Sequence, residues 1–170
     1  MNSYADGIDR LEISVVSQDG CITGHLRTES HIYIEFADED VFYDYTVDEL
    51  TADLQLIIRS LHLKRKEAIR NLVISSGYAL RNNEIDHWDA RVRRYRKALA
   101  EVVSYGESSC SGVGIGMTSA LNDQTVWLKS EFLDDCDEKQ FLSAFYYANE
   151  AMWSDYRTQS RQLKDQYLKA

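Results

Sequence analysis

The first part of the chain alternates apolar and polar residues in short runs, a pattern typical of half-buried strands. Leu11 to Val16 and Cys21 to Leu26 are two such runs. Asp19-Gly20 between them is a strong hairpin signal, because glycine accepts the positive φ of a tight turn. Residues 32–36 alternate in the same way. We therefore expect a three-stranded antiparallel meander over residues 11–36.

A helical pattern replaces the alternation at Val47. Apolar residues then recur at three- and four-residue steps as far as Leu72, which predicts a long amphipathic helix over residues 47–75. Thr46 and Glu49 have the spacing of a capping box, in which each side chain satisfies a free backbone N–H of the other residue. The helix is therefore expected to begin directly after Thr46.

The second half of the chain continues with a shorter helical pattern, a hairpin and another long helix. Helical spacing from Asn82 to Gly106 predicts a second helix, and Val113 to Met117 alternates with glycine as a strand. Residues 125–132 are expected to return as a strand, and an apolar stripe predicts a final helix over residues 137–168. The order βββ–α–α–ββ–α predicts an α+β fold, with two to three long helices packed on one face of an antiparallel sheet.

The length of 170 residues fits a single α+β domain, residues 1–170. Two sub-lobes are expected within it, residues 10–77 and 107–170, joined by a basic helix over residues 83–105. No repeat is evident residue by residue. Only the order of elements recurs loosely, as a hairpin, an acidic connector and a long helix. The lack of proline agrees with long helices, in which proline is disruptive.

Charge is distributed in blocks along the chain, although the net charge is -9. Residues 1–58 contain two basic and 13 acidic side chains, and residues 59–97 contain eleven basic and four acidic ones. The blocks either neutralise one another within the fold or leave a basic face for an anionic partner. The candidate residues for binding an anionic partner are Arg91, Arg93, Arg94, Arg96 and Lys97.

Signatures of catalysis, metal binding or a bound cofactor do not occur in the sequence. The three cysteines form no CxxC motif, and the four histidines have no metal-binding spacing. No P-loop and no GxSxG motif is present. Neither a membrane-spanning run nor a signal peptide is recognisable. We expect a cytoplasmic protein that is not an enzyme and needs no metal or cofactor.

Aromatic residues are abundant, with 11 tyrosines and three tryptophans. Several lie on the final predicted helix beside its apolar stripe, where they either pack in the core or form a dimer or partner surface. The candidate partner-binding residues are Tyr146, Tyr147, Trp153 and Tyr156.

The segment from Leu11 to about Asn71 resembles YbaB/EbfC-like proteins and their variants associated with type VII (ESX) secretion. The shared features are a turn at Ser17-Gln18-Asp19-Gly20, a strand at residues 32–36 and the helix start Asp48-Glu49-Leu50. YbaB-like proteins are small dimers associated with nucleoid DNA, and the type VII variants are cytosolic secretion factors. The long N-terminal helix usual in the family has no counterpart in this chain.

The segment from Gly112 to Tyr156 resembles the C-terminal half of type III secretion chaperones. The shared features are a hairpin at residues 114–117 and 125–128, an acidic turn, and a helix with aromatic positions from Phe141 to Trp153. Both resemblances imply small acidic dimers that bind other proteins.

The sequence therefore favours a cytoplasmic, non-enzymatic protein-binding module, a secretion chaperone or adaptor that forms a homodimer. One alternative is a nucleic-acid-associated protein that uses the basic helix. Another is an immunity or inhibitor protein whose acidic connector, Asp38 to Asp44, binds a basic toxin.

Overall fold

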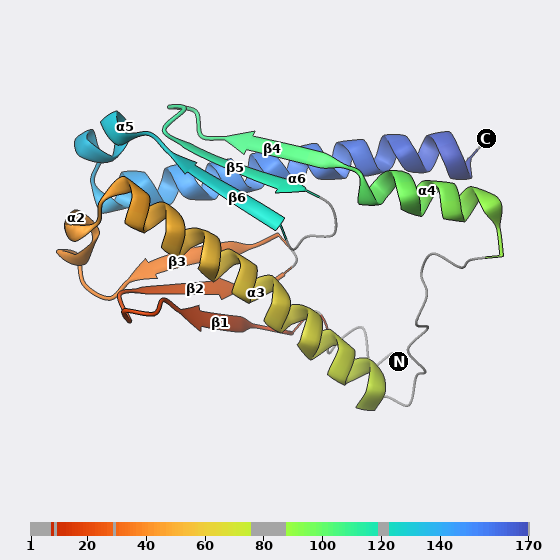
Figure 1. Ribbon diagram of the computed structural model, residues 1–170, viewed down its shortest axis with the longest axis horizontal. Helices are drawn as coiled ribbons and strands as arrows, with labels where there is room; N and C mark the ends of the chain where they lie inside the picture. Colours follow the sequence, from red (N-terminus) through yellow and green to blue (C-terminus); the bar gives the residue numbers. More distant parts are fainter. Residues whose placement is uncertain (1–7, 9, 29, 76–87, 119–122, 170) are drawn as a thin grey trace.

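The computed structural model describes residues 8, 10–28, 30–75, 88–118 and 123–169. These residues form two three-stranded antiparallel sheets, each followed by a short helix and a long helix (Figure 1). The elements of the first half are β1 (Ile13–Val16), β2 (Ile22–Leu26), β3 (Ile32–Phe36), α2 (Val41–Asp44) and α3 (Val47–Ser75). Those of the second are α4 (Ala90–Ala100), β4 (Val103–Glu107), β5 (Val113–Thr118), β6 (Asp123–Leu128), α5 (Ser130–Asp135) and α6 (Glu138–Leu168).

The α+β class is confirmed, and so are both long helices. α3 begins after Thr46, whose hydroxyl accepts from the backbone N–H of Glu49 at 3.3 Å, and the Glu49 carboxylate accepts from the backbone N–H of Thr46 at 3.1 Å. Asp137 and Gln140 form the corresponding capping box of α6. The expected turn at Asp19-Gly20 is also present, with Gly20 at φ 80°.

The prediction of one helix from residue 83 to 105 is wrong at its C-terminal end. α4 ends at Ala100, and residues 103–107 form strand β4. Val103, Tyr105 and Glu107 point outward while Ser104 and Gly106 point inward, so this stretch has the period of a strand. A Cβ at Gly106 would clash with the backbone of α6, so glycine allows β4 to lie directly on that helix. The predicted start of this helix, at Asn82, lies outside the described residues.

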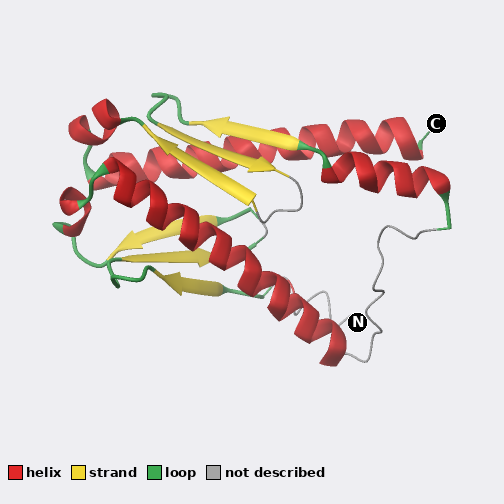
Figure 2. Ribbon diagram, viewed as in Figure 1, coloured by secondary structure: helices red, strands yellow, loops and turns green. Residues whose placement is uncertain are grey.

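The second half therefore contains a full meander instead of a hairpin, and the strands form two sheets instead of one. The strand expected over residues 125–132 ends at Leu128, because residues 130–135 form α5. α3 packs on β1 and β2, and α6 packs on β4 and β5. In Figure 2, α3 crosses in front of the first sheet and α6 runs behind the second. Each sheet thus has one face covered by its own long helix.

The two halves repeat one another with an offset of 91 residues. The helix caps Thr46 and Asp137 are related by this offset. So are the buried positions of the two long helices, which pair as Leu50 with Phe141, Leu54 with Phe145, Ile57 with Ala148, Ile58 with Asn149, Leu61 with Met152 and His62 with Trp153. The first hairpin turn places Gly20 at positive φ, and the second places Ser111 there at φ 53°. The recurring order of elements seen in the sequence is therefore a structural repeat.

The hydrophobic core is one cluster to which both halves contribute. Each long helix also reaches the sheet of the other half, since α3 contacts β6 and α6 contacts β3. Where the equivalent residues His62 and Trp153 meet, their ring centroids are 6.3 Å apart. The two halves are thus packed together through their long helices.

Candidate binding surfaces

The predicted cationic residues all lie on α4. Arg91, Arg93, Arg94 and Lys97 are exposed, and Arg96 is half-buried. The helix begins at Asp89, whose carboxylate accepts from the backbone N–H of Arg91 at 2.8 Å and pairs with its guanidinium at 3.2 Å. The structure therefore presents the predicted basic segment as one exposed helical surface.

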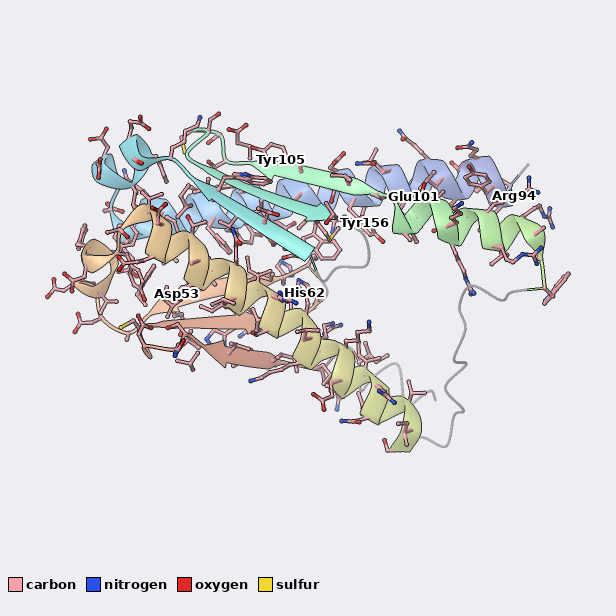
Figure 3. All side chains as sticks on the ribbon, in the orientation of Figure 1. Asp53, His62, Arg94, Glu101, Tyr105 and Tyr156 are labelled. Atoms are coloured by element: carbon pink, nitrogen blue, oxygen red, sulfur yellow. The ribbon has the colours of Figure 1, made fainter. Side chains whose placement is uncertain are left out.

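α4 packs along the distal part of α6, which is basic as well (Figure 3). The Tyr95 hydroxyl lies 3.5 Å from the Ser160 hydroxyl at this contact. We call residues 89–101 and 154–169 together the basic arm. The arm contains nine cations and four acids. Its cations on α6 and the residue after it are Arg157, Arg161, Lys164 and Lys169.

The acidic residues gather at the opposite end of the molecule. We call residues 38–53 and 130–138 the acidic end; they contain twelve acidic side chains and no basic one. α2, α5 and the first turns of α3 and α6 all meet there (Figure 1). With 31 residues, α6 spans about 47 Å between the two ends. The basic helix therefore does not face the acidic end of its own chain.

The structure explains this polarity by the direction of the two long helices. Both begin at the same end with acidic residues, which the positive end of a helix dipole stabilises. The connector Asp38 to Asp44 belongs to the acidic end; in the immunity-protein alternative it is the segment that binds a basic toxin. The charge blocks of the sequence thus become a charge dipole in space.

A cavity of about 550 Å³ lies at the acidic end between the first hairpin turn and α3. The Tyr45 hydroxyl donates to the Asp19 carboxylate at 2.7 Å inside it, and the Ser17 hydroxyl donates to the same carboxylate. The hydrogen bonds from Ser17 and Tyr45 hold the pKa of Asp19 well below its usual range. Burial and the neighbouring Asp19 raise the pKa of Tyr45. These two groups therefore stay carboxylate and phenol over the physiological pH range.

The repeat places a second cavity, of about 520 Å³, at the corresponding position of the second half. Cys110 replaces Asp19 and Cys136 replaces Tyr45, and both thiols line the cavity. A hydrogen bond with Ser108 lowers the pKa of Cys110, whereas burial raises the pKa of Cys136. No histidine is among the described residues that line this cavity. The segment Ser109 to Ser111 is the β4–β5 hairpin turn.

The four predicted partner-binding aromatics of α6 do not form one surface. Tyr146 and Tyr147 are 40% and 59% exposed and contact each other edge to face. Trp153 is only 2% exposed and belongs to the core, so its prediction as a contact residue is wrong. Tyr156 is half-buried and packs against Trp153. Trp153 is buried because it lies on the face of α6 that packs toward α3, where its ring meets His62.

An aromatic surface that sequence reasoning missed lies on the outer face of the second sheet. Tyr105 on β4 and Trp127 on β6 are 48% and 46% exposed, and their rings meet edge to face at 5.3 Å. The Trp127 ring lies over Gly114 and Gly116 of β5 and the Tyr105 ring lies over Gly114, so a side chain at either glycine would crowd these rings. We call these four residues the aromatic platform. The alternation of glycine in β5 is the sequence feature that indicates this platform. The helical spacing up to Gly106, however, places Tyr105 in a predicted helix.

The strands at the sheet margins are hydrogen bonded to side chains from the long helices. The amides of Gln55, Gln159 and Asn149 donate to backbone carbonyls at 3.2, 2.8 and 2.7 Å. The acceptors are Val126 of β6, Val103 of β4 and Ser30 in the turn before β3. In addition, the Tyr105 N–H donates to Asp155, and Lys64 donates to the Ser14 carbonyl. The edges of β1, β4 and β6 are therefore poor templates for added strands.

Within the part of the chain that the structure describes, no three potential metal ligands of the His, Cys, Asp and Glu types are grouped. The same residues include no helix long and apolar enough to cross a membrane. Comparison with protein-family models, curated proteins and solved structures gave no match to this chain.

Proposed function

We propose that the protein is a non-enzymatic, cytoplasmic protein-binding module of the secretion chaperone or adaptor kind. The observation that carries this proposal is the aromatic platform, which leaves two large aromatic rings about half exposed on an uncovered sheet face. The platform, not the α6 aromatics as a group, is the proposed contact surface.

The chemistry of the platform suits a polypeptide. Tyrosine and tryptophan are enriched at protein interfaces because they bury much apolar area and keep a polar group for hydrogen bonding. The glycine floor lets the rings pack directly on β5, so little side-chain entropy remains to be lost on binding. A partner segment can therefore gain contact area at low entropic cost.

The expected homodimer is part of the proposal, and the structure restricts how it would form. Helix side chains hydrogen bond the backbone of the edge strands β1, β4 and β6, so pairing of these strand edges between two copies is disfavoured. A dimer would accordingly use a sheet face or the exposed Tyr146 and Tyr147.

The test compares three tagged proteins in cytosol from the source cells. The platform variant is Tyr105→Thr with Trp127→Thr, which keeps strand propensity and removes the rings. The matched control is Val16→Thr with Tyr33→Thr on the outer face of the first sheet. Wild type and control are expected to retain the same co-purifying protein, and the platform variant is expected to lose it while its circular dichroism spectrum stays unchanged. Recovery of the same proteins with all three, or of none, contradicts the proposal.

A further inference from the structure

We infer that the basic arm is a second binding surface, separate from the aromatic platform, and that it binds an acidic polypeptide segment. The arm combines exposed cations of α4 with cations of the adjoining part of α6. It lies at one extremity of the molecule, where α4 and the end of α6 project beyond the two sheets (Figure 2).

The positive charge of the arm exceeds the negative charge near it, although ion pairs join Arg91 to Asp89, Arg157 to Glu150 and Lys169 to Asp165. Nine cations stand against four acids in the arm, and Arg157, the first of its cations on α6, lies about 28 Å along the helix from Glu138 of the acidic end. At physiological ionic strength the screening length is about 8 Å, so the acidic end neither neutralises the arm nor repels an anion bound there. Solubility is already provided by the net charge of -9. The excess positive charge of the arm therefore suits binding of an external anionic partner.

The composition of the arm suits an amphipathic polypeptide. Four of the five α4 cations are arginines, whose planar guanidinium groups pair with two oxygens of a carboxylate or a phosphate. Ala90 and Ala100 lie at the two ends of α4 and line a cavity of about 650 Å³ together with cations that include Arg94 and Lys97. Apolar methyl groups beside cationic heads suit an amphipathic segment with acidic residues at its margin.

The acids within the arm argue against a nucleic acid. Glu101, Asp155 and Asp165 are interleaved with the cations. A phosphate backbone carries uninterrupted negative charge and would meet these carboxylates, whereas a polypeptide can place a neutral or basic residue opposite each one. The cations also recur at three- and four-residue steps, as Arg94 with Lys97 and Arg157 with Arg161 do. A helical partner offers carboxylates at the same spacing of about 5–6 Å.

The experiment measures binding of the full chain to a fluorescein-labelled peptide whose glutamates recur at helical spacing, by fluorescence anisotropy. A labelled single-stranded oligonucleotide of similar charge is the parallel probe. We expect the peptide to bind more tightly than the oligonucleotide and to be released as salt rises from about 50 to about 500 mM. The arm variant carries Arg93→Glu, Arg94→Glu and Lys97→Glu and is expected to bind the peptide at least about tenfold more weakly.

The matched control carries Arg59→Glu, Lys66→Glu and Arg70→Glu, three exposed positions of α3 with the same change in net charge. It is expected to bind within about twofold of wild type. A neutral variant with glutamine at the three arm positions should bind the peptide with an affinity between those of wild type and the arm variant. This graded loss distinguishes the removal of electrostatic attraction from misfolding. No binding of the peptide at low salt, or equal losses in arm and control variants, overturns the inference. Tighter, arm-dependent binding of the oligonucleotide overturns it as well and makes the arm a nucleic-acid surface.

The test is independent of the aromatic platform. The Tyr105→Thr, Trp127→Thr protein should bind the acidic peptide as wild type does, because neither residue belongs to the arm. Loss of the cytosolic partner with intact peptide binding would therefore locate the two interactions on separate surfaces.

Discussion

The two halves of the molecule have the same order of elements, but their long helices contact their sheets through different atoms. On α3, Ile57 and Leu61 reach the sheet with their side chains, at Gly24 of β2. On α6 the equivalent residues are Ala148 and Met152, and there the helix backbone itself meets Gly106 of β4. Because alanine is small, α6 can approach β4 closely. The same architecture thus tolerates two packing solutions, one through side chains and one through backbone contact.

The outer faces of the sheets have diverged further than the cores. The first sheet presents polar groups, among them His25, which hydrogen bonds Ser14, and Arg27, which stacks over Tyr33. The second presents the aromatic platform. The contrast teaches that the inner faces are constrained by a shared core, while the outer faces are free to acquire separate binding properties.

The largest expected effect comes from adding one methyl group where each long helix packs on its own sheet. Gly106→Ala should lower the free energy of unfolding by about 3 kcal/mol or more, because the α6 backbone must shift. Gly24→Ala should cost clearly less, about 1–2 kcal/mol, since the ends of the Ile57 and Leu61 side chains can move. Urea denaturation of both variants measures the difference. Equal losses would show that the two halves pack in the same way.

A second prediction concerns the contact between the halves, where His62 meets Trp153. Burial, and then the charge of Arg65, lowers the pKa of His62 from 6.5 to about 4 in the folded protein. The unfolded chain binds the proton more readily, so stability should fall as pH drops from 6.5 toward 4, by up to about 3 kcal/mol. Denaturation at a series of pH values measures this loss.

The control for His62 is His62→Gln, which stays neutral and can still hydrogen bond Gln124. Its stability should be nearly constant between pH 6.5 and 5. Asp19 does not interfere in this window, because its lowered pKa makes its stabilisation fade only at more acidic pH. An identical pH profile for wild type and variant would contradict the assignment.

The smallest expected effect is at the two hairpin turns. Ser111 has φ 53°, where glycine is favoured, and its counterpart Gly20 has φ 80°. Ser111→Gly should stabilise the protein by about 0.5 kcal/mol, and Gly20→Ser should destabilise it by about 1 kcal/mol. Thermal unfolding of the two single variants measures both signs. Changes of the same sign would mean that the turns are not equivalent.

Local signals predicted much of the fold. The capped start of α3, its end at Ser75 and the alternation of residues 32–36 were all predicted with their bounds. Strand β4 was missed because Val102 and Leu99 continue a helical spacing into it, and the inward glycine that marks it also resembles a helix stop. The sequence shows the repeat only as a recurring order of elements, because most equivalent residues differ, although Ser17 matches Ser108.

The candidate surfaces were predictable to different degrees. A run of arginines is visible in sequence, and its exposure on α4 agrees with the expected basic face. The aromatic platform depends on the registry of three strands, which pairs Tyr105 with Gly116 and Gly114 with Trp127. No local pattern contains that registry, since its members are far apart in the chain.

The sequence determined the features that depend on neighbouring residues: the capped long helices, the hairpin turn at Gly20 and the blocks of charge. Only the tertiary structure decided which of these features meet. It directs both long helices from the same end, which turns the charge blocks into a dipole, and it buries Trp153 while exposing Trp127. The physical reason is that caps, turns and helical periodicity are local interactions, whereas burial and charge separation arise from contacts between distant segments.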